Sequence, residues 1–540
     1  MISLFYDTTD RFSRYGMDHF IEKYGLSVVP NQRTPSGVAI SYGRDVSAGF
    51  LITVGKNAVE GRYCGTITTA QEKIKVCEIP HDTGSGDEIP AYFEGNGVRY
   101  PCISRNGNRI SIGIDIFRET GYLLSGHLDS VRPDPGHPGG QEIASVPAVD
   151  FLENLLFNAV RAGFSARKIP LVQKSFWPEG RPFAVCLTHD VDEIKKTYQW
   201  ITRPARALVR GDFSGFRDQM ASLVQKIRGN EPYVTYDDLI GIERSLGARS
   251  TYFILKESGQ PDFHSIKSWY LYGRNRSFQT PGMQELIKNL LANGDEVAIH
   301  GSYFSYNTPG LLNAETRELE TCIHDTIVGN RQHNLNLEIP ETWQIQIDAG
   351  LKYDTTLGFK DTIGFRWGTS YPFFPNTGEE PLPLLEIPLI IMDICLERNR
   401  NRKKDCLSIA DEVEKYQGVL TLLWHPPVIN TLEYPGFRDL YIGLCGHCRE
   451  KGAWITGARD IFEWVSLRNR QTFSFSYEDS ACTILPSRPD SGLYFTLYLP
   501  PGTTGVIRSG NARIIRKDGD CIHIKTDKPE AHDTITVGIA

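Results

Sequence analysis

Between residues 180 and 468, short runs of apolar residues alternate with longer stretches in which apolar residues recur every three or four positions. The short runs are typical of buried β-strands and the longer stretches of amphipathic helices. Strands that alternate with helices pair in parallel, which predicts an α/β fold, either a barrel or a doubly wound sheet. The expected strands are FAVCLTH (183–189), RSTYFIL (249–255), DEVAIHG (295–301), LLEIPLIIMD (384–393) and GVLTLLWH (418–425).

The flanking parts of the chain have different patterns. Residues 1 to about 120 alternate short β-rich runs with turn residues, and an amphipathic helix at 148–164 follows a loop rich in Pro and Gly at 132–147. Residues 166–182 are expected to be a linker. The last residues lack helical periodicity and predict a small antiparallel β domain. We therefore expect a mixed α+β domain at 1–175, an α/β domain at 176–468 and a sandwich-like β domain at 469–540.

Composition narrows the class of protein. Of the 540 residues 40% are hydrophobic, which is enough for real cores, and a net charge of −7 argues against binding nucleic acid. Asp7, Asp10 and Arg11 interrupt the start of the chain, and no apolar run is long enough to span a bilayer, so we expect no signal peptide, no transmembrane segment and a cytoplasmic location. The 11 cysteines do not form a secreted disulfide pattern, and we expect Cys445 and Cys448 on a core-facing helix. The sequence leaves the oligomeric state open.

Ionisable residues gather where the expected central strands end. His189, Asp190 and Asp192 follow the apolar run FAVCL, and the two aspartates are two positions apart, so both would point to the same face of an extended chain. His300 and His425 each close another strand. A single histidine after a strand is usually an ordinary loop residue. Three strands with the same feature favour a site, because in parallel α/β folds the chemistry lies at the carboxyl ends of the strands.

These residue types suit hydrolytic acyl transfer. A divalent ion held by Asp192 and His300 would lower the pKa of bound water and polarise a carbonyl group. Asp190 could accept the proton of that water, and a protonated His425 could protonate the leaving nitrogen or oxygen. Asp393, at the end of another strand, either orients His425 or caps a turn.

The central region resembles the polysaccharide deacetylases, the NodB-homology group of carbohydrate esterase family 4, over about residues 180–465. The resemblance rests on HDVD (189–192), GARSTYFIL (247–255), the histidine of DEVAIHG, GNRQHN (329–334) and LLWH (422–425). It implies a distorted (β/α) barrel and a divalent metal, with Zn²⁺ as the expected ion. It also implies individual roles: Asp190 is the catalytic base, Asp192 and His300 bind the metal, Arg331 orients the base, and His425 is the general acid.

One position departs from the family's pattern. The second motif of the family has another metal-binding histidine four residues after the first, where this sequence has Phe304. A catalytic zinc needs three protein ligands, so a substitute must come from elsewhere. His333, two residues beyond Arg331, is the candidate third ligand, with Asn307 or an additional water as alternatives. His189 directly precedes Asp190, so on an extended strand it would point to the opposite face, and it is expected to point into a neighbouring layer.

The sequence therefore predicts a metal-dependent hydrolase that removes an acyl group, such as acetyl, from a carbohydrate. The expected partner is an acetylated sugar, an oligosaccharide or a glycan precursor. Two alternatives stay open. One is a catalytically inactive carbohydrate-binding or scaffold protein on the same barrel, motivated by Phe304. The other is a C–N hydrolase of non-sugar amides, because a barrel does not determine the substrate.

Overall fold

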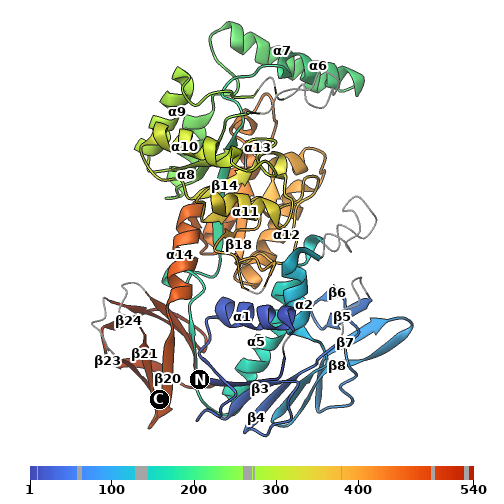
Figure 1. Cartoon of the computed structure of the whole chain (residues 1–540), viewed down its shortest axis with the longest axis vertical. Coiled ribbons are helices and arrows are strands. Elements are labelled where there is room, and N and C mark those ends of the chain that lie inside the picture. The colour runs from blue at the N-terminus through green and yellow to red at the C-terminus, as the bar shows by residue number, and fades with distance from the viewer. Residues whose placement is uncertain are drawn as a thin grey trace.

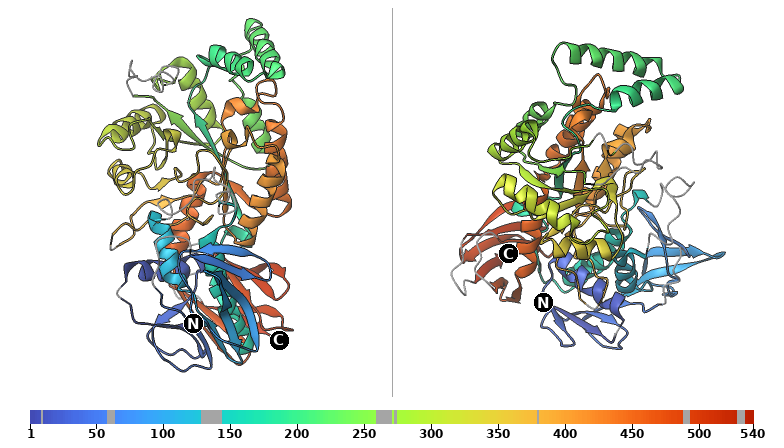
Figure 2. Two further views of the ribbon diagram at one scale, coloured as in Figure 1. Left: turned by 90° about the vertical axis from the view of Figure 1, so that its right-hand side faces the viewer. Right: turned by 45° about the horizontal axis from the view of Figure 1, so that its top comes forward.

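The computed structural model describes residues 1–8, 10–57, 64–127, 144–258, 271, 274–378, 380–487, 493–527 and 534–540. These residues form four sheets (Figures 1 and 2). The N-terminal and C-terminal sheets lie beside each other at one end of the molecule, near both termini, and the central sheet with its helices forms the rest. Of the loop expected at 132–147, residues 132–143 lie outside the described part of the chain.

The N-terminal sheet is mixed and has nine strands in the order β2-β1-β3-β4-β9-β8-β7-β5-β6. Its pairs are parallel from β2 to β9 and antiparallel from β9 to β6. Helix α5 confirms the amphipathic helix expected at 148–164, and the rings of Tyr24 and Phe157 stack with centroids 4.4 Å apart between α1 and α5. The elements are β1 (Ile2–Tyr6), α1 (Arg11–Tyr24), β2 (Val28–Pro30), β3 (Val38–Tyr42), β4 (Phe50–Val54), β5 (Gly65–Thr69), β6 (Lys73–Val76), β7 (Glu88–Gly95), β8 (Val98–Asn106), β9 (Arg109–Ile112), α2 (Ile116–Tyr122), a π-helical turn (Leu123–His127) and α5 (Ala148–Ala166).

The central sheet is entirely parallel and confirms the α/β class. Its order is β16-β15-β14-β13-β12-β11-β18-β17, and β19 pairs with the first half of β11. Every residue of β11 is buried, because helices cover both faces of a parallel sheet. The elements are β11 (Ala184–Val191), α6 (Gln199–Val209), α7 (Phe213–Ile227), α8 (Tyr236–Ser245), β12 (Thr251–Leu255), α9 (Pro281–Ala292), β13 (Glu296–Gly301), α10 (Leu311–Ile323), β14 (Gly329–Gln332), α11 (Glu341–Asp348), β15 (Tyr353–Asp354), β16 (Leu385–Glu386), β17 (Ile391–Met392), α12 (Arg402–Lys415), β18 (Val419–Leu423), α13 (Phe437–Glu450), β19 (Trp454–Thr456) and α14 (Ala458–Arg470). Short 3₁₀ turns lie at Pro178–Gly180, His333–Leu335, Asp393–Leu396 and Pro426–Ile429.

This sheet is a partial barrel, which agrees in its coarser form with the distorted (β/α) barrel that the family resemblance implies. Residues 384–393, expected as one strand, instead supply β16 and β17 at opposite edges of the sheet. Seven strand spacings would separate these edges by about 34 Å in a flat sheet, whereas the five steps from Glu386 to Ile391 reach at most about 18 Å, so the sheet must curl. The linking segment contains Pro388, which has no N–H to donate to a ladder. The backbone N–H of Ile387 donates to Asp354 at one edge, and that of Ile390 donates to Thr421 of β18 near the other.

The remaining two sheets are antiparallel, in the orders β20-β21-β26-β23 and β10-β22-β25-β24. Strand β10 comes from residues 166–182, which were expected to be a linker. It forms because Leu171 and Val172 are fully buried against β22, more than 300 residues later in the chain. The elements are β10 (Leu171–Lys174), β20 (Phe473–Glu478), β21 (Ala481–Pro486), β22 (Tyr494–Tyr498), β23 (Gly505–Ser509), β24 (Ala512–Asp518), β25 (Cys521–Thr526) and β26 (Ile535–Ile539). No helix in the described part of the chain combines the length and the apolar character needed to cross a membrane.

Candidate metal centre and active site

The ionisable residues singled out in the sequence meet at the carboxyl ends of neighbouring central strands. Parallel pairing brings the carboxyl ends of these strands to the same end of the sheet, and the register sets His300 of β13 directly beside Arg331 of β14. Strand β11 lies between β12 and β18 in the same sheet, so its last residues lie at this end as well. The residues brought together are Asp190, Asp192, His300, Arg331, His333 and His425.

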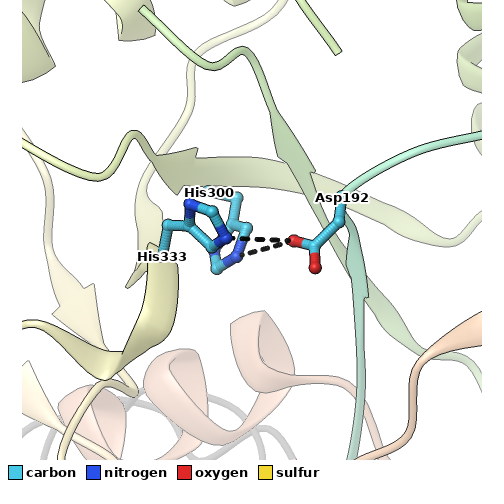
Figure 3. A group of neighbouring side chains, drawn as sticks. All are labelled: Asp192, His300 and His333. Carbon is cyan, nitrogen blue, oxygen red and sulfur yellow. Dashed lines mark ion pairs between the residues drawn. The ribbon is translucent and has the colours of Figure 1, made fainter. Parts of the chain in front are cut away.

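Asp192, His300 and His333 form a group that could hold a metal ion (Figure 3). One potential ligand atom from each residue lies within 4.8 Å of the other two. Asp192 Oδ1 is 3.3 Å from His300 Nε2 and 3.9 Å from His333 Nε2. Ligand atoms about 2.0 Å from a tetrahedral ion lie about 3.3 Å from one another, so the group is close to the spacing that zinc requires. Asp192 Oδ1 is buried and accepts no hydrogen bond from the described residues, which leaves it available to a cation.

Each member of the group is held by a partner on its far side. His300 Nδ1 is 2.7 Å from the carbonyl oxygen of Arg331, so the Nδ1–H tautomer donates there and turns Nε2 toward Asp192. His333 Nδ1 pairs in the same way with Glu257 Oε2, at 3.1 Å. Such hydrogen bonds fix the tautomer and the orientation of a metal-binding histidine. Arg274 Nη1 donates to the second oxygen of Asp192 at 2.7 Å.

The surrounding charges and the burial of the site shift the pKa of each potential ligand. Burial opposes ionisation of Asp192, but Arg274 and His300 outweigh it and hold the pKa of Asp192 well below its ordinary value. Burial also lowers the pKa of His333, which favours the neutral imidazole that binds metal. For His300 burial acts in the same direction, but Asp190 and Asp192 outweigh it and raise its pKa. The three side chains therefore offer one carboxylate and two imidazoles, which are donor types that bind Zn²⁺.

Asp190 lies beside this group, fixed by a buried arginine. Arg331 is fully buried and its Nη1 donates to Asp190 Oδ1 at 2.9 Å. Thr355 holds the rest of the guanidinium, because its carbonyl oxygen and its hydroxyl accept from Nε and Nη2 at 3.1 and 3.0 Å. Burial alone would raise the pKa of Asp190, but His300 and Arg331 outweigh it, so the pKa falls below its ordinary value. Asp190 is therefore an ionised carboxylate in a fixed orientation.

His425 lies on the same site and is oriented by Asp393. The backbone N–H of His425 donates to Asp393 Oδ2 at 2.6 Å, and Nδ1 lies 2.8 Å from Oδ1. Of the two roles open to Asp393, the structure therefore favours orienting His425. Burial lowers the pKa of His425, but the charge of Asp393 and its hydrogen bond outweigh it and raise the pKa to about 9. The imidazole is consequently protonated at neutral pH, with Nδ1 committed to Asp393.

A pocket of about 240 Å³ connects these groups to the surface. Asp190, Asp192 and His425 line it together with the start of α6 and with the loops after β18 and before α8. Its other lining side chains include three tyrosines (Tyr198, Tyr233 and Tyr434), three arginines (Arg203, Arg206 and Arg274) and two glutamates (Glu193 and Glu397). Polar rings and guanidinium groups around a small cavity suit a polar ligand with hydroxyl or acyl groups.

The structure separates the other candidate residues from this site. Phe304, at the position of the family's second histidine, is 40% exposed in the turn after β13, with its ring against that of Tyr303. Asn307 is also exposed and is not part of the potential metal group. His189 points into the neighbouring layer as expected, where Nε2 lies 2.8 Å from Glu243 Oε1. Cys445 and Cys448 are fully buried on α13, which confirms the core-facing helix.

Sequence reasoning missed three residues that position the site, namely Glu257, Arg274 and Thr355. Glu257 follows β12 by two residues, so the same search for ionisable residues after strands would have found it. Thr355 directly follows β15, a strand of two residues that is too short to show a pattern. Arg274 lies in a loop with no periodicity, and only its contact with Asp192 identifies it.

Comparisons with known proteins found distant likenesses among solved structures. No protein-family model matches the chain, and no curated protein matches it in sequence. Among solved structures, a putative polysaccharide deacetylase from Mycobacterium smegmatis has a TM-score of 0.37 and 17% identity, over 54% of this chain and 93% of that one. Puue allantoinase has a TM-score of 0.35 and 13% identity, over 54% of this chain and 92% of the allantoinase. A CE4 family pseudoenzyme from Bacillus anthracis has a TM-score of 0.26 and 12% identity, over 52% of this chain and 65% of the pseudoenzyme. All three are similar to this chain at low identity and over about half of its length.

Proposed function

We propose that this protein is a metal-dependent hydrolase that removes an acyl group, such as acetyl, from a carbohydrate. One observation carries the proposal. Asp192 of the potential metal group, Asp190 paired with Arg331, and His425 paired with Asp393 line one pocket, and His300 and His333 lie directly behind Asp192. Metal-assisted hydrolysis needs these three components within reach of one carbonyl group.

The half of the site around Asp190 activates the attacking water. A divalent ion bound by Asp192, His300 and His333 would lower the pKa of water and polarise the acyl carbonyl. Asp190 then accepts a proton from the water as general base. Arg331 stabilises the ionised carboxylate before this transfer and keeps Oδ1 occupied, so the proton goes to Oδ2.

The opposite half of the site protonates the leaving group. His425 is an imidazolium, and because Nδ1 is held by Asp393, the proton at Nε2 is the one available to the leaving nitrogen or oxygen. The products are acetate and a free amine or hydroxyl on the sugar. Asp393 stabilises the cation before the transfer and fixes the ring in the position from which it donates.

A carbohydrate is the substrate class that the sequence motifs favour, and the tyrosine and arginine side chains of the pocket suit its hydroxyl groups. The alternative, a catalytically inactive carbohydrate-binding or scaffold protein, was motivated by Phe304; the position of His333 in the potential metal group supports the hydrolase over it.

The test measures acetate release from acetylated sugars and oligosaccharides by the purified full chain. After treatment with a chelator we expect no activity, and after addition of Zn²⁺ we expect activity to return at one equivalent per chain. Small non-sugar amides serve as the parallel substrate series. Hydrolysis of these amides alone would replace the carbohydrate assignment, and stoichiometric zinc binding without hydrolysis of either series would contradict the proposed activity.

A further prediction concerns the pH profile of Asp393→Asn. His425 must be protonated to act as an acid, so kcat/KM falls as the pH rises through the pKa of its imidazole. Asparagine removes the charge that raises this pKa to about 9 in the native chain. We therefore expect the alkaline limb of kcat/KM to move to lower pH by about one unit or more, with a smaller loss of rate at acidic pH.

The matched control for this variant is Asp411→Asn. Asp411 also pairs with a histidine, His447, but lies half exposed on α12, away from the pocket. It should leave the pH profile unchanged. An alkaline limb that stays in place in Asp393→Asn would show that another group supplies the proton.

A further inference from the structure

Helices α6 and α7 form a hairpin that projects from the end of the molecule farthest from both termini (Figures 1 and 2). Its apolar side chains are unusually exposed. Ile201 and Val209 of α6 are 76% and 88% exposed, and Phe213 and Ile227 of α7 are 77% and 78% exposed. Leu208, Met220, Leu223 and Val224 are also exposed. Of the 17 large apolar side chains exposed in the described part of the chain, these two helices carry eight.

Helix α7 contacts the body of the protein through its polar face. Its buried side chains are Gln219 and Ser222, and both hydrogen-bond to the buried carboxylate of Glu433. Lys196 joins the same buried network. A surface helix normally buries its apolar stripe and exposes its polar face. In α7 this arrangement is reversed, so Met220, Leu223, Val224 and Ile227, which recur at helical spacing, are 37–78% exposed to solvent.

The charge around the exposed apolar side chains is positive. Residues 199–228 contain six basic residues and two acidic ones, in a chain whose net charge is −7. Arg203 and Lys226 form ion pairs with Glu433 and Glu231, which lie outside this range, and the remaining four basic residues still outnumber the two acidic ones. The basic residues are Arg203, Arg206, Arg210, Arg217, Lys226 and Arg228, and the acidic ones are Asp212 and Asp218. Exposed apolar side chains surrounded by Lys and Arg are typical of helices that lie in the interface of an anionic bilayer.

We propose that the α6–α7 hairpin docks on the surface of an anionic lipid bilayer, with its apolar side chains inserted at the level of the headgroups. The helices have 11 and 15 residues, shorter than the roughly 20 needed to span the hydrocarbon core, so they lie on the bilayer rather than cross it. A second copy of the chain fits this surface less well. A symmetric dimer would bring the basic residues of the two hairpins together, and like charges across an interface repel each other.

The hairpin is also part of the candidate active site. Thr202, Arg203 and Arg206 of α6 line the same pocket as Asp190 and His425. A bilayer docked on α6 and α7 would therefore lie beside the pocket. The docking itself does not depend on the proposed hydrolysis, because it rests on side chains outside the potential metal group.

The test is sedimentation of the full chain with vesicles of phosphatidylcholine alone or of phosphatidylcholine mixed with phosphatidylglycerol. The apolar variant combines Val209→Ser, Phe213→Ser and Ile227→Ser. The charge variant combines Arg210→Gln, Arg217→Gln and Arg228→Gln. The control variant combines Val98→Ser, Leu485→Ser and Val506→Ser, which are also exposed but lie on strands of other sheets. Circular dichroism and thermal melting verify that each variant is folded.

We expect the native chain and the control variant to sediment with anionic vesicles and not with phosphatidylcholine alone. The apolar variant should bind at least about tenfold more weakly, and the charge variant should also bind more weakly, because both the inserted side chains and the cations contribute. High salt should weaken binding by the native chain. The proposal is overturned if the native chain stays in the supernatant with every vesicle or if the apolar variant binds like the native chain. It is also overturned if sedimentation velocity shows a native dimer that the apolar variant dissociates, since a second copy then covers this face.

Discussion

Replacing His333 with asparagine should abolish stoichiometric binding of Zn²⁺ and lower kcat/KM for acyl release by at least about 10³-fold, because several kcal/mol of transition-state stabilisation depends on the ion. The structure motivates this substitution because His333 Nε2 faces Asp192 Oδ1 and completes the group of three potential ligands. Asparagine retains a polar side chain but lacks the ring nitrogen that reaches the ion. Isothermal titration with Zn²⁺ and the acetate assay measure the two effects separately.

His324→Asn is the matched control for this substitution. His324 is exposed at the end of α10 and has φ = 55°, a left-handed conformation that asparagine adopts readily. Zinc binding and rate should therefore be unchanged in this variant. Native zinc affinity in His333→Asn would mean that the third ligand lies elsewhere, and would remove the argument that His333 compensates for Phe304.

The positions of the potential ligands could be predicted in part from the sequence, because strand period and parallel pairing carry much of the information. Asp190 and Asp192 alternate with Val191 at the end of a buried strand, and both carboxylates lie within 3.5 Å of His300 Nε2. Period-two alternation is a local property, so one sequence suffices to read it. Parallel strands have their carboxyl ends at the same end of a sheet. This topological rule places His300 and Arg331 close together without knowledge of any side-chain contact.

The parts that could not be predicted depend on long-range contacts. The sequence named His333 as the candidate third ligand from its position after Arg331, but its proximity to His300 depends on the pairing of β13 with β14, which brings the two rings to a centroid distance of 5.3 Å. Strand β10 could not be recognised because its partner β22 lies near the other end of the chain. The helical period of α7 indicates an apolar face, but it does not show that Glu433 would draw the polar face inward. The curl of the central sheet depends on how residues 387–390 link its two edges, which no local pattern encodes.

Asp190→Asn should lower kcat/KM by about 10²–10⁴-fold and leave zinc stoichiometry unchanged, since it removes a general base and no member of the potential ligand group. The amide oxygen of asparagine can still accept the hydrogen bond from Arg331, whose guanidinium also remains bound to Thr355. The buried guanidinium of Arg331 nevertheless loses its counter-charge, and we expect the free energy of unfolding to fall by up to about 3–5 kcal/mol. Activity is therefore measured well below the melting temperature of the variant.

Asp192→Asn is the informative comparison for this variant, because the two aspartates are neighbours on one strand end but have different assigned roles. Asp192→Asn should lose both zinc and activity, whereas Asp190→Asn should lose activity alone. Loss of zinc in Asp190→Asn would make Asp190 a ligand, and the base would then have to be another carboxylate on the pocket, such as Glu193. An unchanged rate in Asp190→Asn would mean that the attacking water transfers its proton elsewhere. The ion pair between Asp190 and Arg331 would then have a structural role only, because a base held in this orientation must affect the rate when its charge is removed.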